Sequence, residues 1–180
     1  GLPDGRIVIL SGAGLSAASG VPTFRDADGL WEGHHVEEVA TPQAWFADRR
    51  LVRSFYDQRR LSCSEVRPNP GHQALARLQE ELGRNRVFLG PQNIDGLITA
   101  AGAEDSREMH GSLWQLKCEA NDAHPRVAIR GKQDPLASCP ICGALLRPDV
   151  VWFGEIPYGL TEIDEALRSC SLFVSVGTSG

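Results

Sequence analysis

The segment from residue 6 to residue 25 constrains the fold more than any other part of the chain. Its apolar run Arg6–Ser11 leads directly into Gly12-Ala13-Gly14, and small residues continue to Ser19. A strand that ends at Gly-x-Gly and opens into a helix is typical of a phosphate-binding turn, because glycine lets the backbone approach an anion and the helix N-terminus offers unpaired N–H groups. Ala17 replaces the third glycine of the common dinucleotide pattern, which is a permitted variant. Alone the turn is a weak signal, since other strand-to-helix turns are also tight.

The residues after this turn do not follow the usual dinucleotide-binding pattern. A conventional nicotinamide dehydrogenase needs a second strand that ends in an acid soon after the first helix. Residues 19–31 instead read as a loop, because Pro22 and two glycines interrupt them. This loop carries Phe24 and Arg25. We therefore expect it to cover a bound cofactor, and the sequence argues against a dehydrogenase.

Strands and helices alternate along most of the chain. The helices are predicted from apolar residues at helical spacing, with proline at the start or glycine at the end of the segment. The expected strands are Arg6–Ser11, Arg86–Leu89, Leu113–Lys117, Val150–Phe153 and Leu172–Val176. The expected helices are Ala13–Ser19, one from Thr41-Pro42 through Phe55, one from Asn69-Pro70 to Leu82, Ile94–Ala101 and Leu160–Cys170. The alternation predicts an α/β fold with a Rossmann-like, doubly wound parallel sheet.

Two segments interrupt this alternation and are expected to be inserts in one domain. At 180 residues the chain fits a single domain with small insertions. We expect a Rossmann-like lobe of about residues 1–34, 68–117 and 148–180, a helical insert of about 35–67, and a zinc-ribbon-like cysteine insert of about 118–147. Because the chain stops directly after an expected strand, we expect it to lack the C-terminal part of this domain.

Net charge, hydropathy and cysteine content limit the environments and partners that we expect for this chain. The formal charge of −5 disfavours a nucleic-acid partner, and no apolar run is long enough to cross a membrane. Five cysteines, without a secretory signal, indicate a reducing compartment, with metal binding or free thiols in place of disulfides. We therefore expect a cytoplasmic protein, and we expect it to be a monomer.

The cysteine insert carries a partial zinc-binding pattern. Cys139-Pro-Ile-Cys142-Gly is a typical zinc knuckle, and Cys118 lies upstream where a second pair would begin. Position 121 holds Asn121, so the second pair is incomplete. His124 or Asp122 could supply the fourth ligand, or the site could be degraded and the insert held by packing alone. If Zn²⁺ binds, its role is structural, because no substrate-facing group adjoins the cysteines.

Polar residues follow the ends of several expected strands. Gln92-Asn93-Ile94-Asp95 comes after strand Arg86–Leu89, at the sheet edge where α/β proteins bind ligands. Asn93 and Asp95 suit ribose hydroxyls and a carboxamide, although an Asx cap on the next helix is an equally good interpretation. His110, before Gly111, has a pKa range suited to a general base, and Gly177-Thr178-Ser179 suits a phosphate.

Taken in order, these motifs resemble the sirtuins, the NAD-dependent protein-lysine deacylases, over residues from about 6 to the chain end. Those that carry the resemblance are Gly12-Ala-Gly14-x-Ser16-x-x-Ser19-Gly-Val-Pro22-x-Phe24-Arg25, Gln92-Asn-Ile-Asp95, His110-Gly111, the cysteine insert, Val150-Val-Trp-Phe-Gly-Glu155 and Gly177-Thr-Ser179. Within the family, Pro22-Thr-Phe-Arg25 and Tyr56-Asp-Gln-Arg59 resemble the class III branch, which includes bacterial enzymes and removes acidic acyl groups.

The resemblance implies an NAD site and a reaction. The acyl-lysine amide oxygen would attack C1′ of the nicotinamide ribose, nicotinamide would leave, and His110 would act as general base for a ribose hydroxyl that captures the acyl group. Asn93 and Asp95 would orient the ribose and the carboxamide. The implied NAD-binding residues are Gly12, Ala13, Gly14, Ser16, Phe24, Arg25, Trp31, Gln92, Asn93, Ile94, Asp95, Gly177, Thr178 and Ser179.

The resemblance also implies an acyl-lysine site for protein or peptide substrates. Val151, Phe153 and their neighbours would pair with the substrate backbone as an added strand. Tyr56 and Arg59, one helical turn apart, could grip the carboxylate of a succinyl- or malonyl-lysine, with the small Ala40 leaving room for the chain. Without the family match, a solvated helix face would explain Tyr56 and Arg59 better.

Other functions stay open on sequence alone. The chain could be a non-catalytic NAD- or ADP-ribose-binding module, or a sirtuin that acts mainly as a plain deacetylase or an ADP-ribosyltransferase. Because we expect part of the domain to be missing, we also expect incomplete cofactor enclosure, an exposed strand edge, and weak or no activity from these residues alone.

Overall fold

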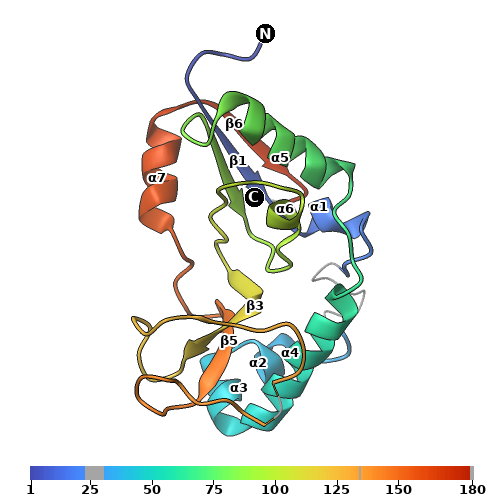
Figure 1. The fold of residues 1–180 in the computed structure, drawn as a ribbon, viewed down its shortest axis with the longest axis vertical. Helices are drawn as coiled ribbons and strands as arrows, with labels where there is room; N and C mark the ends of the chain where they lie inside the picture. Colours follow the sequence, from blue (N-terminus) through green and yellow to red (C-terminus); the bar gives the residue numbers. More distant parts are fainter. Residues whose placement is uncertain (23–30, 134, 179–180) are drawn as a thin grey trace. The chain divides into compact units, whose positions relative to one another are not determined.

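The computed structural model describes residues 1–22, 31–133 and 135–178. These residues form two compact units, each built from several stretches of the chain (Figure 1). Unit 1 comprises Gly1–Thr23, Val66–His110 and Pro157–Gly180, and unit 2 comprises Phe24–Glu65 and Gly111–Ile156.

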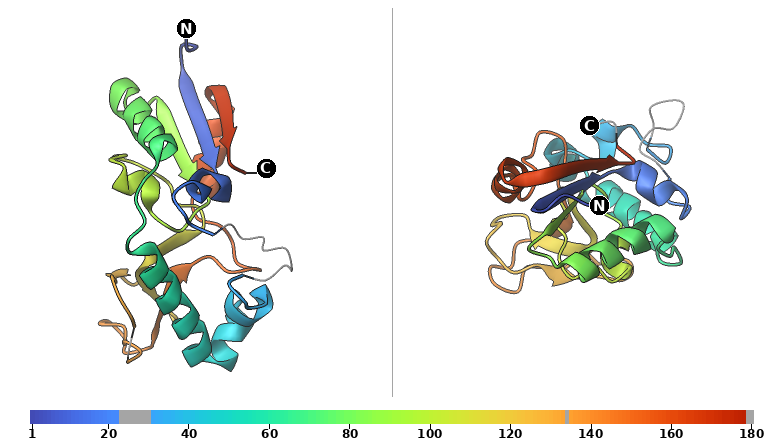
Figure 2. Two further views of the ribbon diagram at one scale, coloured as in Figure 1. Left: turned by 90° about the vertical axis from the view of Figure 1, so that its right-hand side faces the viewer. Right: turned by 90° about the horizontal axis from the view of Figure 1, so that it is seen from above.

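Unit 1 is built on a parallel sheet of three strands in the order β2-β1-β6. These strands are β1 (Arg6–Ser11), β2 (Val87–Pro91) and β6 (Cys170–Val176). Its helices are α1 (Ala13–Ala17), α5 (Pro70–Leu82), α6 (Leu97–Ala100) and α7 (Leu160–Arg168). Because strand side chains alternate between faces, Ile7 and Ile9 pack on the α5 and α6 side, whereas the fully buried Val8 points to the other face. Helix α7 contacts β1 and β6, so helices cover the sheet on both faces (Figures 1 and 2).

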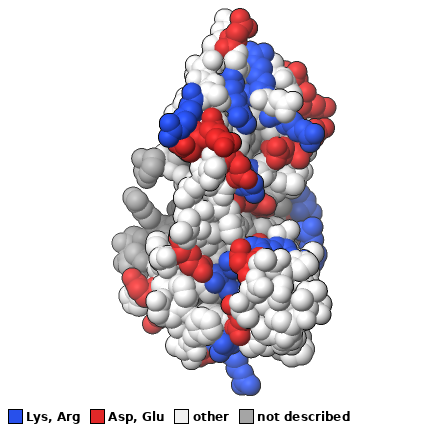
Figure 3. Space-filling model, turned by 90° about the vertical axis from the view of Figure 1, so that its left-hand side faces the viewer, with Lys and Arg blue, Asp and Glu red and all other residues white. Residues whose placement is uncertain are grey.

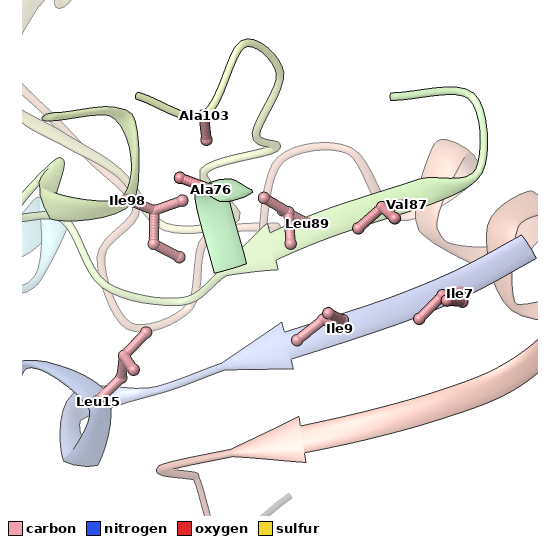
Figure 4. Close-up of a cluster of buried hydrophobic side chains, with 8 residues drawn as sticks. All are labelled: Ile7, Ile9, Leu15, Ala76, Val87, Leu89, Ile98 and Ala103. Carbon is pink, nitrogen blue, oxygen red and sulfur yellow. The ribbon is translucent and has the colours of Figure 1, made fainter. Parts of the chain in front are cut away.

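The core of unit 1 fixes the strands whose ends carry the predicted ligand residues. Apolar residues from β1, β2, three of the helices and the loop after α6 meet in one buried cluster (Figure 4), namely Ile7, Ile9, Leu15, Ala76, Val87, Leu89, Ile98 and Ala103. On the outside of unit 1, acidic and basic side chains intermingle over the face that holds α7 (Figure 3), where Arg107 pairs with Glu162 and Arg168 with Asp164. Ion pairs as exposed as these contribute little to stability, so burial of the apolar cluster dominates.

Unit 2 contains a second sheet, which is antiparallel and has the strand order β4-β3-β5. Its strands are β3 (Gly111–Cys118), β4 (Val127–Ala128) and β5 (Leu146–Val150). Its helices are α2 (Val36–Val39), α3 (Pro42–Ala47) and α4 (Arg49–Cys63). The prediction of a parallel sheet therefore holds for the three strands of unit 1, while the strands expected at 113–117 and 150–153 are not part of it.

The strand expected at Val150–Phe153 was misplaced toward the C-terminus. The observed strand β5 ends at Val150, and its sequence Leu-Arg-Pro-Asp-Val is buried throughout. Arg147 and Asp149 are tolerated there because each has an ion-pair partner, Glu155 and Arg126 respectively. Two charges and a proline hid this strand from a pattern of apolar residues, and proline is accepted because β5 lies at the sheet edge.

The single helix expected from Pro42 through Phe55 is two helices. Asp48 adopts an extended φ of −149° and ends α3. Its carboxylate then accepts the backbone N–H groups of Arg50 and Leu51 as the N-cap of α4. By contrast, the helix from Pro70 to Leu82 is confirmed at both ends, where Asn69 caps it and Gly83 follows.

Candidate functional site

The glycine turn, Gln92 and the end of β6 meet at the carboxyl edge of the unit 1 sheet. The backbone N–H of Gly12 donates to Val176 O at 2.9 Å, and that of Gly14 donates to Gly177 O at 2.8 Å. A Cβ on Gly12 would lie 2.6 Å from Cβ of Thr178, and one on Gly14 would lie 2.8 Å from Cα of Gly177. Only glycine fits both places, so this close approach explains the Gly-x-Gly spacing.

The Thr178 hydroxyl joins the segment after β6 to the segment after β2. Its Oγ1 donates to Oε1 of Gln92 at 3.2 Å, and the backbone N–H of Gln92 donates to Ser11 O at 2.8 Å. Three segments that are far apart in the sequence therefore meet where the strands end. The residues that the sequence assigned to one nucleotide site on unit 1 are brought together here, as far as the structure describes them.

A buried hydrogen-bond network lies beside this turn and centres on Ser16. The Ser16 hydroxyl donates to Oδ2 of Asp95 at 2.6 Å, and it accepts from Nδ2 of Asn93 at 2.8 Å. Asn93 Nδ2 also lies 3.1 Å from the same carboxylate oxygen. These three side chains line a small cavity together with Ser11, Leu15 and residues of α6.

His72 completes the network and was missed in the sequence. Its Nε2 lies 3.1 Å from the Ser16 hydroxyl, and its Nδ1 accepts the backbone N–H of Asn69 at 3.1 Å. The ring proton therefore sits on Nε2 and points at Ser16. Burial lowers the pKa of His72 below its usual range, against the opposing charge of Asp95, which keeps the ring neutral at pH 7. Only its place in the first turn of a helix was visible in the sequence, and the reach to Ser16 is long-range.

Asp95 caps the next helix, which is one of the two roles between which the sequence left a choice, and its second carboxylate oxygen belongs to the Ser16 network. Its Oδ1 accepts the backbone N–H of Leu97 at 2.9 Å, at the start of α6, as an Asx cap does. Its Oδ2 faces Ser16 and Asn93. Helix α6 is accordingly shorter than the expected Ile94–Ala101, and residues 93–96 form the turn that presents the network.

His110 is held next to this edge by backbone contacts. The N–H of Met109 donates to Pro91 O at 2.9 Å, and Met109 O accepts from the N–H of Tyr158 at 2.8 Å. Burial lowers the pKa of His110 below its usual range, opposed by a hydrogen bond to the backbone of Gln92. A neutral imidazole beside Gln92 can accept a proton at pH 7.

The cysteine residues of unit 2 gather with one histidine. The ligand atoms of Cys118, His124, Cys139 and Cys142 all lie within 4.8 Å of one another. Sγ of Cys118 lies 3.6 Å from Sγ of Cys142, and Sγ of Cys139 lies 3.4 Å from Nδ1 of His124. Tetrahedral Zn²⁺ with bonds of about 2.3 Å to sulfur separates its ligand atoms by roughly 3.8 Å, so three thiols and one imidazole fit a structural zinc site.

The second candidate for the fourth ligand is engaged elsewhere. Asp122 pairs with Lys117 at 3.1 Å and with Arg126 at 3.0 Å, and these contacts lower the pKa of its carboxyl although burial opposes them. Burial also opposes ionisation of Cys139, but backbone N–H groups of Cys142 and Ile141, with Cys118 and His124, lower its pKa to about 6. Cys139 is thus a thiolate at neutral pH, the form that binds metal.

The residues assigned to the acyl group are buried in unit 2. Tyr56 is fully buried, and its hydroxyl accepts from Nε1 of Trp152 at 2.9 Å. Arg59 is also buried, so a solvated helix face is excluded for both residues. Burial raises the pKa of Tyr56 far above its usual range, despite the Trp152 hydrogen bond and nearby Arg147, so the phenol stays protonated.

Aromatic rings surround this pair. Trp31 packs edge-on against Phe55 and Tyr56, with ring centroids 4.7 and 6.1 Å apart, and the Arg59 guanidinium lies 5.1 Å from the Trp31 ring. The structure thus places Trp31, assigned to the cofactor, within unit 2 against the acyl candidates. Ala40 is buried, and its carbonyl accepts the N–H of Phe153 at 3.0 Å.

The remaining assigned residues have simpler surroundings. Val151 follows the end of β5, and Phe153 is exposed. Ile94 is half-buried beside Asn93. Phe24, Arg25 and Ser179 lie outside the described residues. Within the described part of the chain, no helix is long and apolar enough to cross a membrane.

A parallel sheet with a glycine turn, a polar network at its strand ends and a cysteine cluster in a separate unit defines a nucleotide-binding α/β protein with a metal-binding insert. Comparison with known proteins identifies the family within this class. The model of the Sir2 family matches residues 12–180, and the chain belongs to that family.

Its relatives agree with this assignment. The NAD-dependent protein deacylase SIR2rp3 of Leishmania major is 48% identical over 181 residues, which cover 97% of this chain and 73% of the relative. An NAD-dependent protein deacylase of Escherichia coli O6:H1 is 46% identical over 97% of this chain and 64% of the relative. A crystal structure of a Sir2 homologue with NAD superposes with a TM-score of 0.83 at 36% identity, covering 98% of this chain and 69% of that one.

Proposed function

We propose that this chain carries the NAD and acyl-lysine sites of an NAD-dependent protein-lysine deacylase. Such an enzyme moves an acyl group from lysine to the ADP-ribose of NAD and releases nicotinamide. The observation that carries the proposal is the arrangement at the sheet edge of unit 1, where the glycine turn, the Ser16 network and His110 are linked through Gln92 and its neighbours. Membership of the Sir2 family supports it.

In this proposal the unit 1 edge binds NAD. The backbone of Gly12-Ala13-Gly14 comes close to the phosphates because two of its residues lack side chains, and Thr178, with Ser179 beyond it, lies on the phosphate and adenosine side. The Ser16–Asn93–Asp95 network, with Gln92 and Ile94, holds the nicotinamide ribose and carboxamide. Phe24 and Arg25 are proposed to belong to a loop that covers NAD, whereas Trp31, which the sequence assigned to the same loop, packs against Phe55 and Tyr56 in unit 2. When bound, NAD supplies the electrophilic sugar carbon and the hydroxyl that accepts the acyl group.

His110 is proposed as the general base. Its lowered pKa leaves the ring neutral at pH 7, ready to take the proton of a ribose hydroxyl. Asn93 and Asp95 are proposed to orient the sugar. Their side chains are already held by hydrogen bonds to Ser16, so binding costs little side-chain conformational entropy.

Unit 2 is proposed to bind the acylated protein or peptide. Val151 and Phe153, after the end of β5, pair with the substrate backbone, and Phe153 is exposed for this contact. Tyr56 and Arg59 grip an acidic acyl group, and Ala40 leaves space for it. The neutral phenol can donate to a carboxylate, and the buried guanidinium supplies a charge.

Zn²⁺ is proposed to be held by Cys118, Cys139, Cys142 and His124 as a structural ion. It would tie β3, the loop after it and the Cys139–Cys142 turn into one body. The five cysteines form no disulfide in the part of the chain that the structure describes, which supports a cytoplasmic location. We propose that the protein is a monomer.

Nicotinamide release with succinyl-lysine and acetyl-lysine peptides tests the proposal. The wild-type protein, His110→Ala and Arg59→Met are compared. We expect the histidine variant to lose turnover with both peptides and keep NAD binding, and the arginine variant to lose turnover with the succinyl peptide only. A non-catalytic NAD-binding module would bind NAD and release no nicotinamide in any variant. Equal use of both peptides by the wild type would indicate a plain deacetylase.

A further inference from the structure

Among the described residues, the Arg59 guanidinium has one ion-pair partner, and that partner comes from a turn distant in the sequence. Its Nη1 donates to Oε1 of Glu32 at 2.6 Å. Its Nε is buried and has no hydrogen-bond partner among the described residues. The Arg59 side chain is 4% exposed, whereas that of Glu32 is 27% exposed. Arg59 is therefore a buried charge with at least one unused N–H donor, and the Glu32 carboxylate lies on its more exposed side.

Glu32 is held on Arg59 by a tight turn in a costly backbone conformation. The backbones of Trp31 and His34 exchange hydrogen bonds of 2.8 and 3.1 Å across Glu32 and Gly33. Glu32 has a φ of +48°, and Gly33 one of +81°. Two positive φ values in sequence define a type I′ turn, where asparagine or glycine is usual at the first position. Among the described residues, Glu32 alone has a positive φ without being glycine.

The charges around Tyr56 are already balanced. Arg147 makes two hydrogen bonds with the carboxylate of Glu155, at 2.8 and 2.9 Å, and Arg59 pairs with Glu32. A further carboxylate entering this environment would add an unpaired negative charge unless one glutamate gave way. Glu155 is the less movable of the two, because it also accepts the N–H of Trp152 at 2.8 Å.

We propose that Glu32 occupies the place on Arg59 that the carboxylate of an acidic acyl group takes, and that it sets the preference between acidic and neutral acyl chains. A succinyl- or malonyl-lysine exchanges its carboxylate for that of Glu32, which swings to solvent from its half-exposed position. The Tyr56 hydroxyl, which accepts from Trp152, keeps its own proton to donate to the incoming group. An acetyl-lysine brings no carboxylate and leaves the pair closed. The inference rests on the proposed function and adds a competitor inside its acyl site.

A positioning role for Glu32 predicts the opposite result. If Glu32 only held Arg59 in place, its removal would loosen the guanidinium and weaken binding of acidic acyl groups. A competitor, once removed, frees Arg59 and strengthens that binding. The sign of the effect separates the two roles.

The experiment measures steady-state deacylation and peptide binding for Glu32→Gln, with one peptide carrying either succinyl- or acetyl-lysine. Binding of a fluorescent peptide is followed by anisotropy, which does not depend on turnover. Glu37→Gln is the matched control, because Glu37 is exposed on α2 and the charge change is the same. Thermal unfolding of each variant checks that the fold is intact.

We expect Glu32→Gln to lower KM and Kd for the succinyl peptide by about three- to tenfold with little change in kcat, since one competing ion pair is lost. Values for the acetyl peptide, and all values for Glu37→Gln, stay within about twofold. In an Arg59→Met background the gain disappears. Unchanged or weaker succinyl binding in a folded Glu32→Gln protein overturns the inference. A wild-type protein that neither binds nor deacylates any acyl peptide contradicts the proposed function itself.

Discussion

The two candidate sites are built from different forces. At the sheet edge of unit 1, Ser16, His72, Asn93 and Asp95 are joined by hydrogen bonds, and only one member carries a charge. In unit 2, buried arginines meet carboxylates, as in Arg59 with Glu32 and Arg60 with Asp57. A network with few charges selects its ligand by shape and by the positions of hydrogen-bond donors. Buried charge pairs respond strongly to any added charge. Changes to metal, charge and protonation should therefore affect the two units unequally.

The largest expected effect comes from removal of the metal. Structural zinc in small domains contributes about 10–16 kcal/mol to folding, and the Cys118–His124–Cys139–Cys142 cluster fits such an ion. Chelation, or Cys139→Ser, should unfold the cysteine insert and lower the unfolding temperature of unit 2, while NAD binding at unit 1 persists.

Differential scanning calorimetry with parallel titration of NAD checks this. The free Cys170, on β6, gives the control Cys170→Ser, which should leave the transition in place. A zinc-to-protein ratio near zero in material with an unchanged transition would contradict the metal assignment.

The second largest effect is expected at the buried pair of Arg60 and Asp57. The Arg60 side chain is fully buried, donates to the carbonyls of Gly131 and Leu113, and pairs with Asp57. Arg60→Met leaves the carboxylate of Asp57 buried, which costs about 3–5 kcal/mol, toward the low end because Arg53 lies 3.8 Å away. Denaturant unfolding measures the loss.

Matched variants isolate the charge effect. Arg50→Met removes an exposed arginine from the same helix and should cost less than about 0.5 kcal/mol. Adding Asp57→Asn to Arg60→Met should recover part of the stability, because the unpaired charge is gone. If the double variant is no more stable than Arg60→Met, buried charge is not the cause.

The two units also differ in how well the sequence predicted them. The unit 1 edge depends on local patterns: a strand, Gly-x-Gly, and polar residues directly after the next strand. Most of the residues that meet there can therefore be named from the sequence, while their roles stay predictions. His72 was missed because its contact to Ser16 spans distant helices. In unit 2 the strand Leu146–Val150 and the partner of Arg59 depend on ion pairs between remote segments, which no local pattern encodes.

A smaller effect is expected when the centre of the unit 1 network is removed. Ser16→Ala leaves Asp95 without its 2.6 Å donor and His72 Nε2 without its acceptor. Loss of such buried hydrogen bonds costs about 1–3 kcal/mol, so we expect NAD to bind about tenfold or more weakly. Isothermal titration with NAD measures this, and Ser175→Ala, at an exposed position on β6, serves as control.

The smallest expected effect is a shift in pH dependence, and it sharpens the contrast between the units. Burial lowers the pKa of both His110 and His72, so each ring is neutral above its lowered folded-state pKa and gains a proton only on acidification below the ordinary value of 6.5. Because a base must be unprotonated to act, kcat/KM should stay level from pH 8 down to about 6.5 and fall at lower pH. The free energy of unfolding should also decrease below pH 6.5, since the unfolded chain binds more protons there than the folded one. The contact of Arg59 with Glu32 in unit 2 involves neither histidine, so the preference for succinyl over acetyl peptide should not change with pH while the rate falls. An acid limb centred above pH 6.5 would contradict the lowered pKa of His110. A preference that changes along the limb would show that the two sites are not independent.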